Sequence, residues 1–191
     1  MTYNILIAGV GGQGTLLASK LMGVVFMGKG YDIKVSEVHG MSQRGGSVVT
    51  YVRFGENVAS TVIEKGEADM VLSFELLESA RWLPYLKKDG VLISNTQKIN
   101  PMPVITGQMS YPEDIETKLR STGVRLQTVD ALTLAEKAGS AKSVNVVLLG
   151  VAAKYFGIER EAWEEAIRAT VPPKTVDINL AAFAAGYEIK E

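Results

Sequence analysis

Short apolar runs of strand length alternate with longer segments of helical period along the chain. Runs rich in apolar and β-branched residues predict strands at residues 5–8, 31–35, 48–54, 59–63, 69–73, 90–95 and 124–129. Helical periodicity predicts helices at residues 16–27, 76–86, 112–121, 131–138, 144–156, 160–170 and 176–185. This alternation indicates an α/β fold: a Rossmann-like, doubly wound, mostly parallel sheet with helices on both faces. Residues 48–54 and 59–63 flank a turn, and we expect them to form an antiparallel hairpin within that sheet.

Two of the predicted helices are unusually apolar. Within residues 16–27 only Ser19, Lys20 and Gly23 interrupt the apolar positions, and a helix that is apolar nearly all round is buried. Residues 144–156 are also strongly apolar, with Asn145 near the start. Because a buried asparagine must be hydrogen-bonded, we expect Asn145 to brace a loop; the alternative is that it faces a ligand or a partner.

A glycine turn joins the first predicted strand to the first predicted helix. Gly9, Gly11 and Gly14 follow the G-x-G-x-x-G spacing, and Gly12 and Gln13 lie between them. Glycine lets the backbone N–H groups approach a ligand, and the helix that follows offers its positive dipole end. The turn therefore predicts a phosphate-bearing or nucleotide-like ligand, whereas the alternative is a purely structural turn or a subunit contact.

A second polar segment, residues 36–47, follows the predicted strand at 31–35. It holds the only histidine of the chain, and its candidate binding residues are His39, Ser42, Gln43, Arg44, Gly45 and Gly46. Ligands of open α/β sheets bind beyond the carboxyl ends of the strands, so we expect this segment to lie beside the glycine turn. The alternative is a connecting loop in which Arg44 pairs with a carboxylate.

Two carboxylates also follow predicted strands. Glu37 lies about 20 residues beyond the glycine turn, where an acidic residue could bind a ribose hydroxyl. That spacing keeps a dinucleotide open as the ligand. Glu75 follows residues 69–73 and is expected either near the ligand or at the N-terminus of the next helix, where a carboxylate is favourable.

Composition narrows the classes of function. The chain has 191 residues, a formal net charge of -1 and no cysteine, which fits a single domain and excludes disulfides, a thiol nucleophile and thiolate-held clusters within this chain. Basic residues form no stripe that would favour nucleic acid. No P-loop, metal-ligating histidine pair or G-x-S-x-G pattern is present, so no metal site is predicted. No secretory signal is recognised, and the lack of cysteine favours a cytoplasmic location.

The two glycine-rich segments together resemble one family. Gly9-Val10-Gly11-Gly12-Gln13-Gly14, followed by Glu37-Val38-His39-Gly40-Met41-Ser42-Gln43-Arg44-Gly45-Gly46-Ser47-Val48, strongly resembles the gamma subunit or domain of 2-oxoacid:ferredoxin oxidoreductases, and most closely the small beta subunit of the indolepyruvate type. The resemblance covers nearly the whole chain, including the stretches around Ser143-Val144-Asn145 and at 179–186. The second motif is the more specific of the two.

The resemblance implies a role in a larger enzyme. In that family a thiamine diphosphate-dependent complex oxidatively decarboxylates a 2-oxoacid to an acyl-CoA and passes electrons through iron–sulfur clusters to ferredoxin. It implies that a large partner subunit holds the thiamine diphosphate and the clusters, that coenzyme A is a co-substrate, and that this chain, which is inactive alone, homodimerises within a heterotetramer. Indolepyruvate or another aryl pyruvate is the expected substrate, although branched-chain oxoacids, pyruvate and 2-oxoglutarate stay open.

The resemblance also implies which residues face the reaction centre. Two are expected to be catalytic, His39 as a proton shuttle or structural donor and Arg44 as the partner of an anionic group. The expected cofactor-binding residues are Gly9, Gly11, Gly12, Gln13, Gly14, Ser42, Gln43, Gly45 and Gly46. Two alternatives stay open: a freestanding NAD(P)- or FAD-binding oxidoreductase, and a non-catalytic subunit that only braces a partner.

Overall fold

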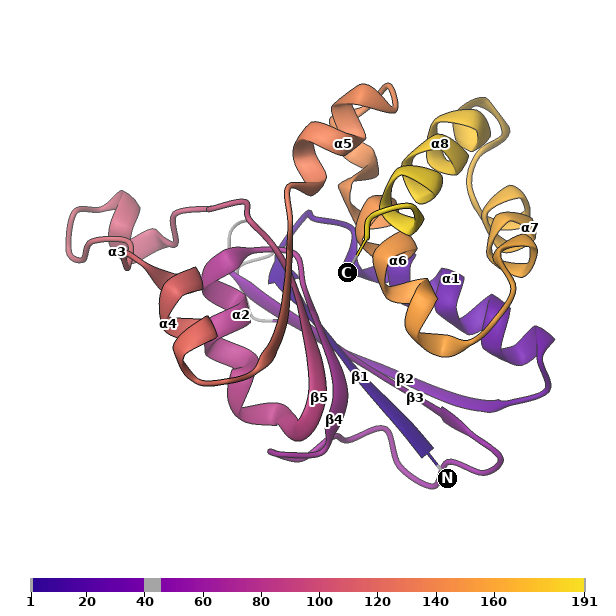
Figure 1. The fold of residues 1–191 in the computed structure, drawn as a ribbon, viewed down its shortest axis with the longest axis horizontal. Coiled ribbons are helices and arrows are strands. Elements are labelled where there is room, and N and C mark those ends of the chain that lie inside the picture. The colour runs from indigo at the N-terminus through magenta and orange to yellow at the C-terminus, as the bar shows by residue number, and fades with distance from the viewer. Residues whose placement is uncertain (1, 40–45, 191) are drawn as a thin grey trace.

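Six strands form one mixed sheet at the centre of the molecule. The computed structural model describes residues 2–39 and 46–190. The strands are β1 (Thr2–Val10), β2 (Asp32–His39), β3 (Ser47–Gly55), β4 (Ala68–Ser73), β5 (Leu86–Asn95) and β6 (Arg125–Val129). They lie in the order β2-β3-β1-β4-β5-β6. Among them β3 runs against the rest, antiparallel to β1 and β2, whereas β1, β4, β5 and β6 pair in parallel. The predicted mostly parallel α/β sheet is confirmed (Figure 1).

The predicted hairpin partner of β3 is wrong. Residues 59–63 form no strand, and β3 pairs instead with β2 on one side and β1 on the other. Because both edges of β3 are occupied, no ladder position remains for a third strand. The 59–63 segment is held by Arg53, whose Nη1 donates to the carbonyl oxygens of Ser60 at 3.1 Å and Val62 at 2.7 Å. Ile63 is buried in the core on one face of the sheet.

Five helices cover one face of the sheet. They are α1 (Thr15–Gly28), α5 (Ala131–Lys137), α6 (Val144–Ala153), α7 (Arg160–Thr170) and α8 (Val176–Tyr187). Alternate residues of β1 point to opposite faces, so Ile5 and Ile7 join the core under these helices while Leu6 and Ala8 join the core on the other face. Figure 1 shows the five helices gathered on one side of the sheet.

The opposite face carries a thinner layer. It consists of α2 (Leu76–Trp82) and α4 (Ile115–Ser121), and α3 (Met102–Ile105) stands away from the sheet. Single 3₁₀ turns occur at Leu83–Tyr85, Ala141–Ser143, Lys154–Phe156 and Pro173–Thr175. Among the residues that the structure describes, no helix combines the length and apolar character that crossing a bilayer requires.

Helices α6 and α8 cross at two glycines. A Cβ atom at Gly150 would lie 2.2 Å from the carbonyl oxygen of Phe183, and one at Gly186 would lie 1.9 Å from that of Val147. The helix backbones therefore touch, and a larger residue at either position would push them apart. Every residue of α6 is buried, which explains why this segment is apolar on all sides.

Several strands and helices begin or end at other residues than predicted, in one case because a neighbouring strand extends the pairing. Strand β2 continues to His39 rather than ending at residue 35, because β3 supplies ladder partners as far as His39 opposite Val48. Strand β5 begins at Leu86 rather than residue 90, and α3 lies between the predicted strand at 90–95 and the predicted helix at 112–121, where no element is predicted. The predicted helix at 112–121 begins at Ile115.

Candidate functional site

The glycine turn and the second polar segment meet at one edge of the sheet. Val10 at the end of β1 lies opposite Ser47 at the start of β3, and the N–H of Gly11 donates to the carbonyl oxygen of Gly46 at 3.0 Å. Strand β2 ends at the same edge, with His39 opposite Val48. The expectation that residues 36–47 lie beside the turn is confirmed for Gly46 and Ser47, whereas the end of β2 reaches the same edge of the sheet but is separated from β1 by β3.

Both backbone conformation and close packing require glycine in the turn. Gly12 and Gly14 have φ angles of 97° and 83°, in the left-handed region that favours glycine. At Gly14 a Cβ atom would also lie 2.5 Å from Nδ2 of Asn145. Gly12 has open space at its Cβ position, so only Gly14 is restricted by both conformation and contact.

The side chain of Gln13 folds back into the protein. Its Oε1 accepts a hydrogen bond from the N–H of Val10 at 2.7 Å, and its Nε2 donates to the carbonyl oxygen of Phe74 at 2.9 Å and to Oε1 of Gln97 at 3.3 Å. Gln13 thus ties the end of β1 to the segments that follow β4 and β5. These three hydrogen bonds give Gln13 a structural role that does not depend on a ligand.

Asn145 braces the glycine turn, as the sequence predicts. Its Nδ2 donates to the carbonyl oxygen of Gly14 at 3.2 Å, and its Oδ1 accepts from the N–H of Val146 at 3.0 Å. The buried amide therefore fixes the start of α6 against the start of α1. Asn145 is buried, and an unpaired amide in such a position would be costly.

A cleft of about 450 Å³ opens between the glycine turn and the start of α6. Its lining residues are Gly12, Gln13, Gly14, Gln97, Leu132, Ala141, Lys142 and Val144. Lys142 brings a positive charge to this cleft, and the first turn of α1 begins directly after Gly14. The first N–H groups of a helix lack intrahelical acceptors, although in α1 the N–H of Leu17 already donates to the carbonyl oxygen of Gly14. The start of α1 and Lys142 are thus two features of the cleft that favour a phosphate or a carboxylate.

On the other side of the turn, Glu75 is a structural carboxylate. It caps α2, with Oε2 accepting from the N–H of Glu78 at 2.9 Å. Its Oε1 accepts from the N–H of Ile99 at 3.0 Å and from the hydroxyl of Tyr111 at 2.6 Å. Burial, together with this hydrogen bond to Glu75, raises the pKa of Tyr111, so the phenol remains the donor. Of the two expected positions for Glu75, the helix cap is confirmed.

Glu78 fixes the start of β3. Its Oε2 accepts from the hydroxyl of Ser47 at 2.5 Å and from Nε1 of Trp82 at 3.1 Å, and its Oε1 accepts from Nε of Arg81 at 3.0 Å. A hollow of about 230 Å³ lies here, bordered by both carboxylates, by Ser47 and by residues 101–103. Nothing in the sequence singles out Glu78, because its partner Ser47 lies 31 positions away.

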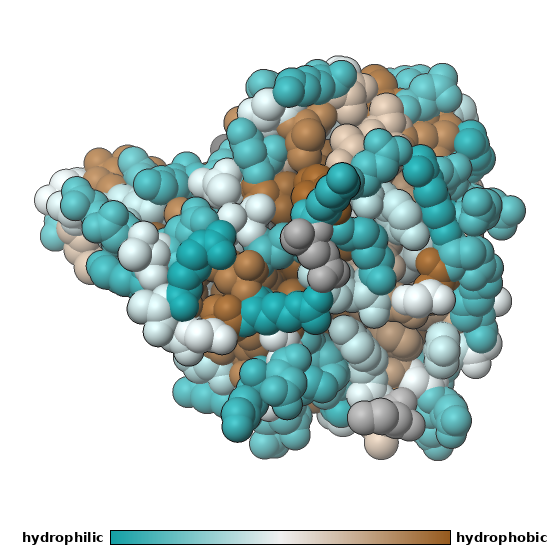
Figure 2. Space-filling view, viewed as in Figure 1, coloured by the Kyte–Doolittle hydropathy of each residue, from teal (hydrophilic) through white to brown (hydrophobic). Residues whose placement is uncertain are grey.

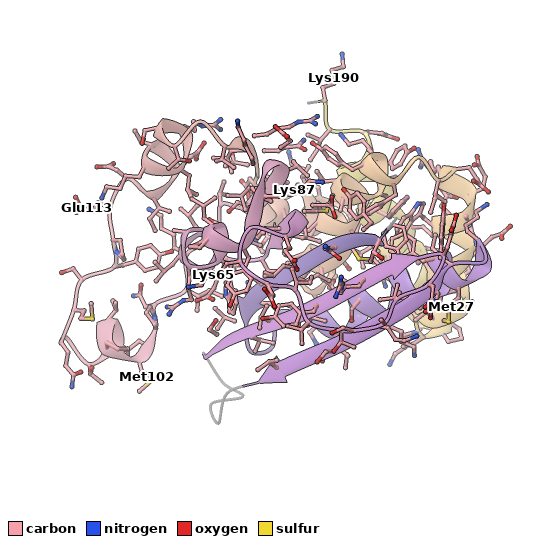
Figure 3. All side chains as sticks on the ribbon, turned by 90° about the horizontal axis from the view of Figure 1, so that it is seen from below. Met27, Lys65, Lys87, Met102, Glu113 and Lys190 are labelled. Atoms are coloured by element: carbon pink, nitrogen blue, oxygen red, sulfur yellow. The ribbon has the colours of Figure 1, made fainter. Side chains whose placement is uncertain are left out.

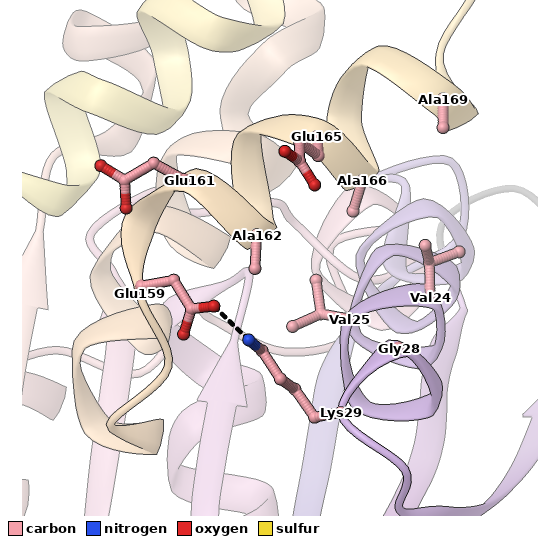
Figure 4. Close-up of a pocket in the computed structure, with 10 residues that line it drawn as sticks. All are labelled: Val24, Val25, Gly28, Lys29, Glu159, Glu161, Ala162, Glu165, Ala166 and Ala169. Atoms are coloured by element: carbon pink, nitrogen blue, oxygen red, sulfur yellow. Dashed lines mark hydrogen bonds and ion pairs between the residues drawn. The ribbon is translucent and has the colours of Figure 1, made fainter.

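A third hollow lies between α1 and α7, away from the glycine turn. Its volume is about 350 Å³, and its lining includes Val24, Lys29, Glu159, Glu161 and Glu165. Lys29 of this lining forms an ion pair with Glu159 (Figure 4). The remaining carboxylates make this hollow unsuitable for an anion, and it contains none of the candidate site residues.

Comparison with known proteins identifies the family. The profile of the family "Pyruvate ferredoxin/flavodoxin oxidoreductase" matches residues 4–189. The chain belongs to this family. It is 45% identical to indolepyruvate oxidoreductase subunit IorB of Thermococcus kodakarensis, over 97% of this chain and 95% of that protein. It is 28% identical to the pyruvate/ketoisovalerate oxidoreductases common subunit gamma of Pyrococcus abyssi, over 94% of this chain and 92% of that protein.

A solved structure agrees with this membership. The gamma subunit of keto/oxoacid ferredoxin oxidoreductase from Geobacter sulfurreducens matches with a TM-score of 0.71 and 25% identity, covering 97% of this chain and 96% of that one. The resemblance to 2-oxoacid oxidoreductase small subunits, which the sequence indicates, is therefore confirmed. The pyruvate ferredoxin/flavodoxin oxidoreductase fold extends through all the helices and strands described above.

Seven of the eleven candidate residues lie in the part of the chain that the structure describes, His39 with its backbone alone. Gly9, Gly11, Gly12, Gln13, Gly14 and Gly46 lie together at the carboxyl edge of the sheet. The backbone of His39 ends β2 at that edge. Ser42, Gln43, Arg44 and Gly45, and the side chain of His39, lie outside the described residues. Lys142 is the cleft residue that sequence reasoning missed, although it directly precedes the stretch Ser143-Val144-Asn145 that carries the resemblance.

The strand order argues against a dinucleotide at the turn. In a dinucleotide-binding sheet the acidic residue that binds the ribose ends the strand next to β1. Here β3 lies between β1 and β2, so Glu37 is two strand spacings from β1, about 10 Å. A ribose positioned by the glycine turn would face β3 rather than Glu37.

Proposed function

We propose that the chain is the small subunit of an indolepyruvate:ferredoxin oxidoreductase. The observation that carries the proposal is the 45% identity to an indolepyruvate oxidoreductase subunit along nearly the full length of both chains. The reaction consumes the 2-oxoacid, coenzyme A and two oxidised ferredoxins. It yields the acyl-CoA, carbon dioxide, two reduced ferredoxins and one proton, so charge and electrons balance.

The cofactors of the proposed reaction belong mainly to the partner. Iron–sulfur clusters need thiolate ligands, and this chain has no cysteine, so the clusters sit in the large subunit. Thiamine diphosphate, when bound there, supplies the carbanion stabilisation that decarboxylation needs. We propose that residues 1–191 form one gamma-type domain. The chain would act in the cytoplasm, in a heterotetramer with two copies of each subunit.

Within this chain, the cleft beside the glycine turn is the proposed anion site. The N–H groups near Gly12 and Gly14 and the ammonium of Lys142 would hold a phosphate of coenzyme A or the carboxylate of the oxoacid. The cleft residues fit such a group, because they offer hydrogen-bond donors and a cation around a space of about 450 Å³. Gly9 and Gln13 support the turn from the protein side.

The second segment completes the proposed site. Arg44 pairs with an anionic group of the substrate, His39 holds or moves a proton, and Ser42 and Gln43 donate neutral hydrogen bonds. Gly46 accepts a hydrogen bond from the N–H of Gly11 through its carbonyl oxygen, and Gly45 is the neighbouring cofactor-binding residue of the proposal. In the assembled complex Arg44→Ala raises the KM for the oxoacid or for coenzyme A. Unchanged kinetics would remove Arg44 from the site and favour a subunit that only braces its partner.

Co-purification tests the proposal directly. A tagged copy of the chain is recovered from the extract of its native cell, and the large protein that accompanies it is identified and assayed for iron and thiamine diphosphate. We expect a large subunit with both cofactors, together with ferredoxin reduction that depends on indolepyruvate and coenzyme A. A chain that is recovered alone and binds NADH or FAD would instead support the freestanding oxidoreductase.

A further inference from the structure

A finger, defined as residues 96–111, projects from the carboxyl edge of the sheet. It leaves the end of β5, forms α3 and returns toward α4. Figure 1 shows α3 at one extremity of the molecule, and Figure 3, seen after a 90° turn, places Met102 at an extremity again. The finger therefore extends away from the rest of the molecule in both views.

Three large apolar side chains are exposed at the tip of the finger, among exposed polar residues such as Thr106 and Gln108. Met102, Ile105 and Met109 are 56%, 64% and 66% exposed. The sequence of the finger, residues 96–111, contains one charged residue, Lys98. Figure 2 shows apolar surface on this projection. Clustered exposed apolar side chains mark interaction sites more often than isolated ones do.

The tip has a defined backbone structure that presents these side chains. The N–H groups of Val104 and Ile105 donate to the carbonyl oxygen of Pro101, and those of Gln108 and Met109 donate to that of Pro103. The two prolines fix φ before and within the single helical turn. Because the turn satisfies its own backbone, it can present Ile105 and Met109 without rearrangement, and ordering it on binding costs little entropy.

The stem of the finger is bonded to the candidate site. Glu75 accepts from Ile99 and Tyr111, one on each side of the tip, and Oε1 of Gln97 accepts from Nε2 of Gln13 in the glycine turn. The hollow of about 230 Å³ is lined both by Gly46 and Ser47 and by residues 101–103. The finger and the glycine turn thus border one continuous surface.

We infer that the finger is a docking element that inserts Ile105 and Met109 into an apolar recess of the large partner subunit. The inference rests on the proposed function, because a subunit that brings its reaction centre to the glycine turn must cover the adjoining surface and reach the finger. A second copy of this chain is the competing occupant, and the test below distinguishes it from the large subunit.

The test compares two matched double variants for binding to the purified large subunit by surface plasmon resonance. The finger variant is Ile105→Gln with Met109→Gln. The control variant is Met27→Gln with Val62→Gln, at side chains that are 58% and 54% exposed elsewhere on the molecule. Thermal unfolding verifies that both variants fold, and the single variant Met109→Gln replaces the double one if it does not.

We expect the finger variant to bind about 100-fold more weakly, as loss of apolar anchors does, while the control variant binds like the wild-type chain. Equal binding by the finger variant, or equal weakening by the control, would overturn the inference. Sedimentation of the chain alone identifies a second copy as the occupant if the finger variant dissociates a homodimer, which would also overturn it. If the wild-type chain fails to bind the large subunit at all, the proposed function itself fails and the inference fails with it.

Discussion

The two sides of the glycine turn carry charges of opposite sign: buried carboxylates on one side and an exposed lysine on the other. On the α2 side, Glu75 and Glu78 are buried and accept hydrogen bonds from six protein donors in all. On the α6 side, Lys142 is exposed at the rim of a cleft of about 450 Å³. The carboxylates are thus engaged in holding the protein together, whereas the cation is available to a ligand.

We therefore expect residues on the acidic side of the turn to support the fold and Lys142 on the other side to bind a ligand. A buried charge must be fully hydrogen-bonded, so the acidic side is sensitive to any lost partner. An exposed lysine contributes little to folding, and replacing it should change affinity alone. Variants of the buried carboxylates should therefore change the stability of the fold, and variants of Lys142 should change the affinity for a ligand.

Removing the buried carboxylate should have the largest effect on stability. Glu75→Ala leaves the N–H groups of Glu78 and Ile99 and the hydroxyl of Tyr111 without their acceptor, and should lower the free energy of unfolding by about 3 kcal/mol. Urea unfolding of the isolated chain measures this. The control Glu113→Ala, at an exposed carboxylate near the finger (Figure 3), should change it by less than about 0.5 kcal/mol. Similar values for both variants would show that Glu75 does not support the stem.

The glycine turn itself allows a matched pair. Gly12→Ala and Gly14→Ala both force a left-handed backbone on alanine, but only Gly14→Ala also drives a methyl group into Asn145. We expect losses in the free energy of unfolding of about 1 kcal/mol for Gly12→Ala and about 2 to 3 kcal/mol for Gly14→Ala. Equal losses in the same urea titrations would contradict the brace between the turn and α6.

Lys142→Ala should leave folding unchanged and weaken binding. In the reconstituted complex we expect the KM for coenzyme A or for the oxoacid to rise about tenfold, because a charge-assisted contact to the anion is lost. Lys174→Ala, at an exposed lysine in a separate 3₁₀ turn, is the control and should match the wild type. An unchanged KM for both substrates would exclude the cleft as the anion site.

A half-buried carboxylate on α4, Glu116, is expected to have the smallest effect. A hydrogen bond from Arg120 lowers the pKa of Glu116. A folded-state pKa below the unfolded one means that this stabilisation is present above the unfolded pKa and disappears as the pH falls through the folded value. We expect Glu116→Gln to cost about 0.4 kcal/mol at neutral pH and nothing in strongly acidic solution, measured by urea unfolding at several pH values. A cost that persists at low pH would have another cause than the ion pair.

Local patterns predicted the fold class, the glycine turn and its brace. The turn follows from glycine spacing over six residues, and the role of Asn145 from one polar residue in an apolar helix. The cap formed by Glu75 depends likewise on its position just before a helix. Each of these predictions needed information from only a short window of sequence, together with general rules for burial and helix ends.

The features that the sequence did not predict depend on contacts between distant segments. The hairpin of β3 with residues 59–63 was wrong because β1 and β2 already occupy both edges of β3, and no local pattern records that. Lys142 reaches the turn only because α6 packs beside α1, and Glu78 reaches Ser47 across the sheet edge. No element is predicted between residues 96 and 111, and no pattern there indicates that Ile105 and Met109 would be exposed.

We propose that two polypeptides share one reaction centre at the glycine turn. Reduction of ferredoxin, dependent on indolepyruvate and coenzyme A, is measured for the purified large subunit, for this chain, and for the two together. The account predicts turnover only when both are present. Turnover by this chain alone, or full turnover by the large subunit without it, would contradict the account.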